Sequence, residues 1–169
     1  MVQRMSSASP SPLADARDLA PRIKNSIKVP DFVNRLPQGL SSLEFWKASE
    51  FRSWLLYYSL PILNEFLPEP EKYVQHWILL VGATYLLLQE NISEGDLQRA
   101  DIMLRMFVRD VDTLYGKIHY TYNVHQLLHL TLMVKRWGNL FSNSGFLFKI
   151  LMESYIDLYM ALNTKDRNL

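Results

Sequence analysis

The sequence contains no cysteine, which excludes disulfide bonds and thiolate metal sites. It also lacks a long hydrophobic run. The longest one, from Trp77 to Leu88, covers twelve residues, includes Gly82, and is too short to cross a bilayer. The N-terminal stretch VQRMSSASPSP has no apolar core of the kind found in signal peptides. These absences predict an intracellular protein with no membrane partner.

A large charge of one sign is also missing, since the net charge is +1. This argues against electrostatic binding of nucleic acid over the whole surface of the domain. Residues 1 to 40, however, carry six Lys or Arg against three Asp. If DNA is a partner, the expected contacts are the basic side chains of this leader, Arg22, Lys24, Lys28 and Arg35. The alternative is that the leader is only solvated.

No run of alternating polar and apolar residues bounded by hairpin signals occurs, so strands are not expected. Apolar residues instead recur at helical spacing. The predicted fold is all-α, a single bundle of about five main helices over residues 41 to 169. Residues 1 to 40, with their prolines, are predicted to be a flexible or extended leader containing at most a short helix.

The first main helix is predicted from a capping box at Ser41 to Glu44, after which apolar positions recur as far as Leu63. Pro61 is expected to kink or interrupt it. Its predicted core residues are Trp46, Trp54, Leu55 and Tyr58.

A second helix is predicted over residues 71 to 90, apolar on nearly all sides and therefore central in the bundle. Ser93 and Asp96 predict the N-terminus of a third helix, and Gly116 its end. Its apolar stripe comprises Ala100, Met103, Leu104, Phe107, Val111 and Leu114. A fourth helix is predicted from Asn123 to Trp137, before Gly138, and a last one over residues 146 to 162.

The sharpest chemical pattern is the pair His125 and His129, four residues apart on one helix. This is zinc-ligand spacing, but Gln126 stands where a zincin would have its Glu, and no third ligand is indicated. We therefore expect no tight metal site and no cofactor in the isolated chain. The alternative to metal binding is a partly buried pair that hydrogen-bonds to His76 or Asn123.

Glu50 is the other candidate, because it lies among apolar residues of the first helix. It could be a metal ligand of a nuclease-type site or a partner of Lys47 or Arg52, and spacing favours the second reading. Asp101, Asp110 and Asp112 are typical of a solvated helix face. Four tyrosines could stack on bases, although core packing is favoured for them: Tyr57, Tyr58, Tyr120 and Tyr122.

Five segments carry a family resemblance in order: IKVPDFVNRLPQGLSSLEFWKASEFRSWLLYYSLPIL, ISEGDLQRADIMLRMFV, LYG, NVHQLLHL and VKRWGNL. Over roughly residues 23 to 148 the chain resembles the helical region C-terminal to the catalytic core of CACTA (En/Spm)-type DNA transposases. Such enzymes use an RNase H-like core whose acidic residues hold two metal ions. The earlier part of that core has no counterpart here.

The resemblance implies a nuclear protein. It implies Glu50 as a last acidic residue, with a catalytic role and Mg²⁺ only within an intact transposase. Lys149 stands where the family has Glu, which puts the role of that position in doubt. The leading hypothesis is a transposase-derived, non-catalytic module that binds a protein partner or DNA. The alternatives are a fragment of a working transposase that needs the missing core, and a purely structural or oligomerising bundle.

Overall fold

The described part of the chain, residues 45–66, 70–140, 154 and 158 of a computed structural model, is helical and contains no strand. The predicted all-α fold is therefore confirmed. The elements are α3 (Ala48–Ser53), the π-helical turn η3 (Trp54–Tyr58), α4 (Ser59–Phe66), α5 (Pro70–Leu87), α6 (Glu94–Tyr115), the 3₁₀ turn η4 (Lys117–His119), α7 (Tyr122–Gln126), the 3₁₀ turn η5 (Leu127–His129) and α8 (Leu130–Trp137).

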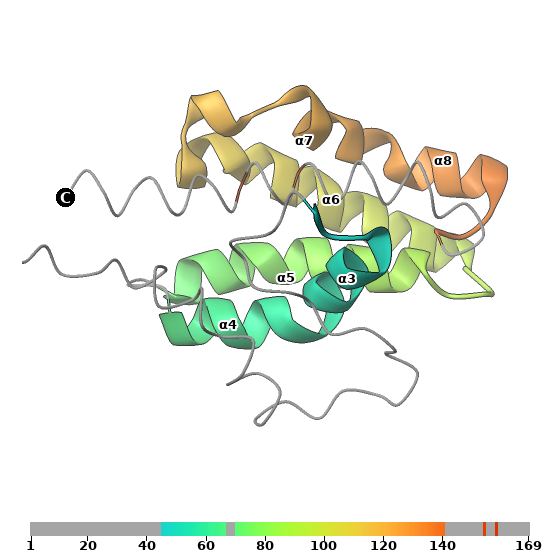
Figure 1. The fold of residues 1–169 in the computed structure, drawn as a ribbon. Helices are drawn as coiled ribbons and strands as arrows, with labels where there is room; N and C mark the ends of the chain where they lie inside the picture. The colour runs from blue at the N-terminus through green and yellow to red at the C-terminus, as the bar shows by residue number, and fades with distance from the viewer. Residues whose placement is uncertain (1–44, 67–69, 141–153, 155–157, 159–169) are drawn as a thin grey trace, which may run out of the picture.

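These elements form four rods that pack in chain order. Figure 1 shows α4, α5, α6 and then α7 with α8 lying side by side, and α5 packs against α4 and η3 on one side and against α6 on the other. The α6 helix in turn packs against η5 and α8. Each rod therefore buries its apolar side mainly against its neighbours in sequence.

The predicted capping box at the start of the first rod, Ser41 to Glu44, lies outside the described residues. The first α-helical residue of this rod is Ala48. Glu50 lies in the first turn, and its Oε2 accepts a hydrogen bond from the backbone N–H of Lys47 at 2.8 Å. A carboxylate at this position satisfies an amide that has no partner within the helix.

Pro61 perturbs the first rod as predicted, but the irregularity lies in the turn before it. Proline has no N–H, and its ring collides with the carbonyl four residues earlier, here that of Tyr57. The turn containing Tyr57 is widened into η3, where the N–H of Ser59 bonds to the carbonyl of Trp54, five residues back. The rod then continues as α4 through Pro61 to Phe66.

The spacing of buried residues gives a second reason for the widened turn. Buried pairs recur every four residues along the rod, at 50–51, 54–55, 58–59 and 62–63. An α-helix has 3.6 residues per turn, so a four-residue repeat drifts around it, whereas a π-helical turn holds about 4.4. One such turn keeps all four pairs on one side. The side chains of Trp46, Trp54, Leu55 and Tyr58 are each at most 6% exposed.

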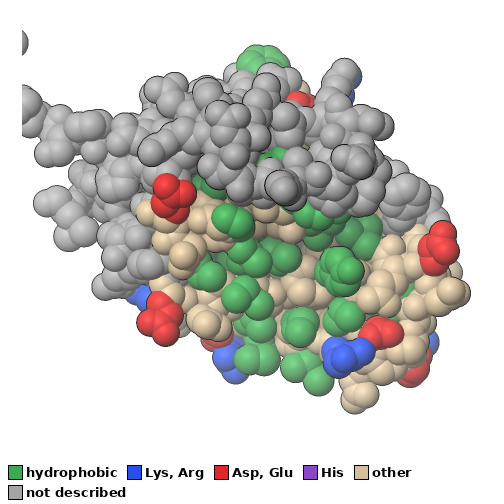
Figure 2. Space-filling model, turned by 90° about the horizontal axis from the view of Figure 1, so that it is seen from below, with side chains coloured by type: hydrophobic (Ala, Val, Ile, Leu, Met, Phe, Trp, Pro, Cys, Tyr) green, Lys and Arg blue, Asp and Glu red, His purple; other side chains and the backbone are tan. Residues whose placement is uncertain are grey.

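The α5 helix occupies the centre of the layer, close to the predicted range. Its buried side chains are Tyr73, His76, Trp77, Leu80, Ala83, Thr84 and Leu87. The expectation of a helix covered on nearly all sides is wrong for one face, because Ile78 is 41% and Tyr85 is 65% exposed. Figure 2 shows hydrophobic side chains gathered in the middle of one face of the molecule, with charged side chains around them.

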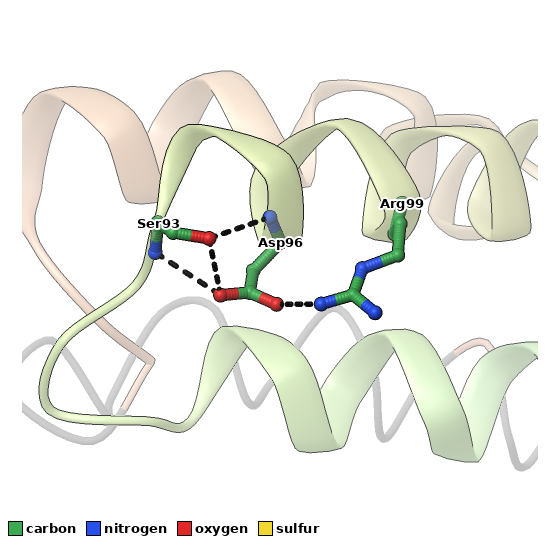
Figure 3. A network of polar contacts seen from close by, with 3 residues as sticks. All are labelled: Ser93, Asp96 and Arg99. Carbon is green, nitrogen blue, oxygen red and sulfur yellow. Dashed lines mark hydrogen bonds and ion pairs between the residues drawn. The ribbon is translucent and has the colours of Figure 1, made fainter.

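The N-terminus of α6 confirms the predicted cap. The N–H of Asp96 donates to Ser93 Oγ at 3.1 Å, and the N–H of Ser93 donates to Asp96 Oδ2 at 3.2 Å. Asp96 also pairs with Arg99 (Figure 3). The hydroxyl of Ser93 and, after it, Arg99 lower the pKa of Asp96. The helix ends at Gly116, whose φ of 100° is costly for any residue with a Cβ.

The predicted fourth helix is present but is not continuous, because the 3₁₀ turn η5 separates α7 from α8. In a 3₁₀ turn residues three apart share a face. The turn thus places Val124, Leu127 and Leu130 together, all with 0% exposure. After Gly138 (φ 90°), the N–H of Leu140 bonds to the carbonyl of Leu87 at 3.0 Å and ties this rod to the end of α5.

Of the last predicted helix, over residues 146 to 162, only two residues are described. Ser154 and Leu158 are both helical and fully buried. The remainder of that range, Lys149 included, lies outside the described residues, as does the leader, residues 1 to 40.

Candidate functional site

Glu50, the residue to which the family resemblance assigns catalysis, is 1% exposed in the first turn of α3. One carboxylate oxygen accepts the Lys47 backbone amide described above. Glu50 thus contacts Lys47, but through the backbone N–H of that residue and not through its charged side chain. Among residues 45–66, 70–140, 154 and 158, no three His, Asp or Glu side chains group closely enough to hold a metal ion.

His125 and His129 lie near each other as the spacing predicts, with ring centroids 5.4 Å apart and ring planes at 75°. The expectation that they are partly buried is wrong, since both side chains are exposed. The expected bond to His76 is also wrong, because both ring nitrogens of His76 contact residues of α6. The pair is exposed because Val124, Leu127 and Leu130 take the inward positions of this segment.

His76 forms a buried polar link between α5 and α6 whose importance the sequence did not reveal. Its Nε2 lies 2.8 Å from the carbonyl oxygen of Phe107, and its Nδ1 lies 3.1 Å from the hydroxyl of Tyr115. A carbonyl only accepts, so Nε2 carries the proton; in the neutral ring Nδ1 then accepts from the tyrosine. The imidazole also stacks on the Phe107 ring, with centroids 4.1 Å apart.

The surroundings of this link favour uncharged groups. Burial lowers the pKa of His76, although the bond to the Phe107 carbonyl and the negative charge of Asp110 oppose the change. Burial, together with Tyr73, raises the pKa of Tyr115 well above its usual range. Both groups are thus neutral at pH 7 and act as a fixed hydrogen-bonded pair. A lone His within the apolar second helix was the only signal of it in the sequence.

The tyrosines considered for base stacking divide into two groups. Tyr58 is fully buried and Tyr57 is half-buried. Tyr120 is 41% and Tyr122 is 75% exposed, so core packing was the wrong expectation for these two. Tyr122 is the first residue of α7, and Tyr120 lies two residues before it.

An exposed apolar surface lies where α5 packs against α6. We call it the α5–α6 face and define it by Ile78, Gly82 and Tyr85 of α5 and Ile102, Met103 and Met106 of α6. Its four most exposed members, Ile78, Tyr85, Ile102 and Met106, range from 39% to 65% exposed. The helices approach closely in its middle, because a Cβ built on Gly82 would lie 3.4 Å from the Met103 sulfur.

Ion pairs flank this face along α6. Arg99 pairs with Asp96 near the start of the helix, and Arg109 pairs with Asp110 at 2.7 Å ten residues further on. The two arginine side chains are 66% and 67% exposed, whereas the aspartates are 14% and 35% exposed. The apolar residues of α6 therefore lie between two charged pairs that each contain both signs.

No helix in the described part of the chain is both long and apolar enough to span a membrane. The four leader residues considered for DNA contact, Arg22, Lys24, Lys28 and Arg35, lie outside that part. No protein-family model, curated protein or solved structure matches the chain. Kinship with CACTA-type transposases therefore stays a prediction based on the quoted motifs.

Proposed function

We propose that this chain is a transposase-derived, non-catalytic interaction module, and that its α5–α6 face binds a second copy of the chain. The observation that carries the proposal is the exposure of Ile78, Tyr85, Ile102 and Met106 on two adjacent helices. Single exposed apolar residues are ordinary, but a contiguous group ringed by charges is typical of a protein contact.

The residue types in this face suit such a contact. Aromatic side chains and methionine are enriched in the buried centres of interfaces. Methionine also adapts its shape to a partner because its side chain is unbranched and flexible. Gly82 has no side chain, and the Met103 side chain lies against it, which adds a flexible apolar group to the face.

The charges favour a second copy as the occupant. A two-fold axis passing near the middle of α6 would set two α6 helices antiparallel, with Ile102 of each opposite Met106 of the other. The same operation brings the Arg99 pair of one copy beside the Arg109 pair of the other. Arg99 can then bond to Asp110 of the second copy, and each end of the interface carries equal numbers of opposite charges.

The environment of Glu50 supports the non-catalytic part of the proposal. Its carboxylate is nearly inaccessible and bonds to a backbone amide at the start of α3. That is a capping contact, which stabilises a helix terminus. The fragment of an intact, Mg²⁺-dependent transposase remains the alternative, and both readings place the protein in the nucleus with DNA contacts proposed for the leader.

Sedimentation velocity of the full chain over a range of concentrations tests the proposal. We expect a reversible dimer that Ile78→Asp or Met106→Asp weakens by at least about tenfold, since either change buries a charge in the interface. The matched control is Ile118→Asp, because Ile118 is 85% exposed on η4 and lies away from the face. The Ile118→Asp chain should dimerise as the parent chain does.

The proposed antiparallel arrangement of the two α6 helices allows a second test, based on exchanging charges. Arg99→Asp should weaken the dimer because like charges then meet, and adding Asp110→Arg should restore it. Circular dichroism checks that each variant is folded. A wild-type chain that stays monomeric at the highest concentrations would overturn the choice of partner, and a dimer unaffected by both face variants would overturn the choice of surface.

A further inference from the structure

The side chains of His125 and His129 are both exposed and lie side by side, at the spacing of two ligands of one metal ion. The residues lie in α7 and η5, on the opposite flank of α6 from α5. The ring centroids are 5.4 Å apart. Both side chains are exposed, which leaves them open to solvent.

The separation can be compared with that in a tetrahedral site. A zinc–nitrogen bond is about 2.1 Å long, which places the metal about 3.2 Å from the centroid of each imidazole. At a tetrahedral angle the two centroids are then about 5.2 Å apart. The observed centroid distance of 5.4 Å is within a few tenths of an ångström of this value, so the spacing of the two rings is compatible with a shared ion.

We propose that His125 and His129 bind a divalent transition-metal ion of the zinc class, with water in the remaining positions. Neutral imidazole is a good ligand for Zn²⁺ and Ni²⁺ but a poor one for Mg²⁺, which prefers oxygen. The proposal assigns two protein ligands, His125 and His129, and water as the others. The site is therefore open and exchangeable, unlike the closed four-ligand site of a structural zinc.

The chain offers matched variants for the test. Either His125→Ala or His129→Ala removes one ligand without disturbing the core, because both side chains are exposed. His119→Ala is the control, since His119 lies in η4, six residues before His125, and has no part in the pair. Circular dichroism of all variants should match that of the full chain.

Isothermal titration of the full chain with Zn²⁺, in a buffer that does not bind metal, should show one saturable site per chain. Loss of even an outer hydrogen-bond partner of a ligand costs about 10- to 100-fold in affinity. Each single variant should therefore bind at least about tenfold more weakly, whereas His119→Ala should bind as the parent does. Ni²⁺ should compete with Zn²⁺, and Mg²⁺ should not.

Several results would overturn the assignment. One is unchanged zinc affinity in the doubly substituted chain, and another is an equal loss in His119→Ala. Competition by Mg²⁺ would identify a carboxylate site instead. This test is independent of dimer formation through the α5–α6 face, and the Ile78→Asp variant should bind zinc normally.

Discussion

Replacing His76 by leucine isolates the energetic role of the buried link between α5 and α6. Leucine keeps an apolar side chain of similar size at a position that is 4% exposed, so little packing volume is lost. The change removes the bonds to Phe107 and Tyr115. The Tyr115 hydroxyl is then buried without its acceptor.

The expected loss of stability depends on which polar groups lose their hydrogen bonds. A buried hydroxyl without a hydrogen bond costs about 1 to 3 kcal/mol, and the lost bond to the Phe107 carbonyl adds about 0.5 to 1.5. His76→Leu should therefore lower the free energy of unfolding by about 1.5 to 4.5 kcal/mol. Tyr115→Phe leaves Nδ1 of His76 without a donor and should cost about 1 to 3 kcal/mol.

The double variant separates this account from one based on packing alone. With both polar partners gone, no orphaned hydroxyl or ring nitrogen remains, so the double variant should be less destabilised than the sum of the two single variants by at least about 2 kcal/mol. Urea unfolding followed by circular dichroism measures all four proteins. Additivity within about 0.5 kcal/mol would refute the hydrogen-bonded link.

The same residue predicts a pH dependence. Because burial holds the pKa of His76 below its value of 6.5 in the unfolded chain, the unfolded state takes up the proton more readily. The stability that His76 contributes is complete above pH 6.5 and is lost as the pH falls below it, down to the lowered pKa of the folded state. His76→Leu should abolish this loss. The exposed control His129→Gln should keep it, and an opposite slope would contradict the argument.

The other predictions concern the core, one helix cap and the relation to transposases. Trp54→Ala should cost about 3 to 5 kcal/mol in urea unfolding; a cost below about 1 would contradict the burial of Trp54 at 2% exposure. Ser93→Ala should cost about 0.5 to 2 kcal/mol, because the α6 cap is lost; the exposed Arg99→Ala should change stability by about 0.5 or less, and an equal loss would assign the effect to the ion pair. DNA binding, if measured by gel shift across a salt series, should be weak, salt-dependent and lost on deletion of residues 1 to 40; binding that survives the deletion would place the contact on the helices. Purified chain should not nick DNA with Mg²⁺, and nicking that disappears in Glu50→Ala would refute the non-catalytic proposal.

The features that the sequence predicted well are those that depend only on contacts between residues close together in the chain. Ser93 and Asp96 lie three apart, so their reciprocal bonds need only the local chain, and a glycine such as Gly116 marks a helix end through its own backbone freedom. The apolar stripe of α6 was likewise readable because Ala100, Leu104 and Val111 repeat at helical spacing.

The features that were missed depend on distant residues. His76 bonds to residues 31 and 39 positions away, and no local pattern shows that pairing. Apolar character alone does not tell which side of α5 is covered, so Ile78 and Tyr85 could not be separated from Leu80 and Leu87. The exposure of the His125 pair had the same cause, since the neighbouring rods decide which face of α7 is inward.

The candidate sites were only partly predictable for a related reason. The sequence singled out Glu50 and the two histidines by residue type and spacing, but a functional group also needs access. The structure buries Glu50 and exposes His125 and His129, and for the histidines this is the reverse of the expected partial burial.

The widened turn η3 makes the first rod tolerant to a change in chain length. A π-helical turn is an α-helical turn with one residue more, so removal of one residue between Trp54 and Tyr58 can be absorbed by a return to α-helical geometry. The buried pairs before and after the turn would keep their common side. A single deletion in the middle of α5 would instead turn the rest of that helix by about 100°, which would move its buried side chains away from α4 and α6. Gaps in alignments with related sequences should therefore fall at η3 and not within α5.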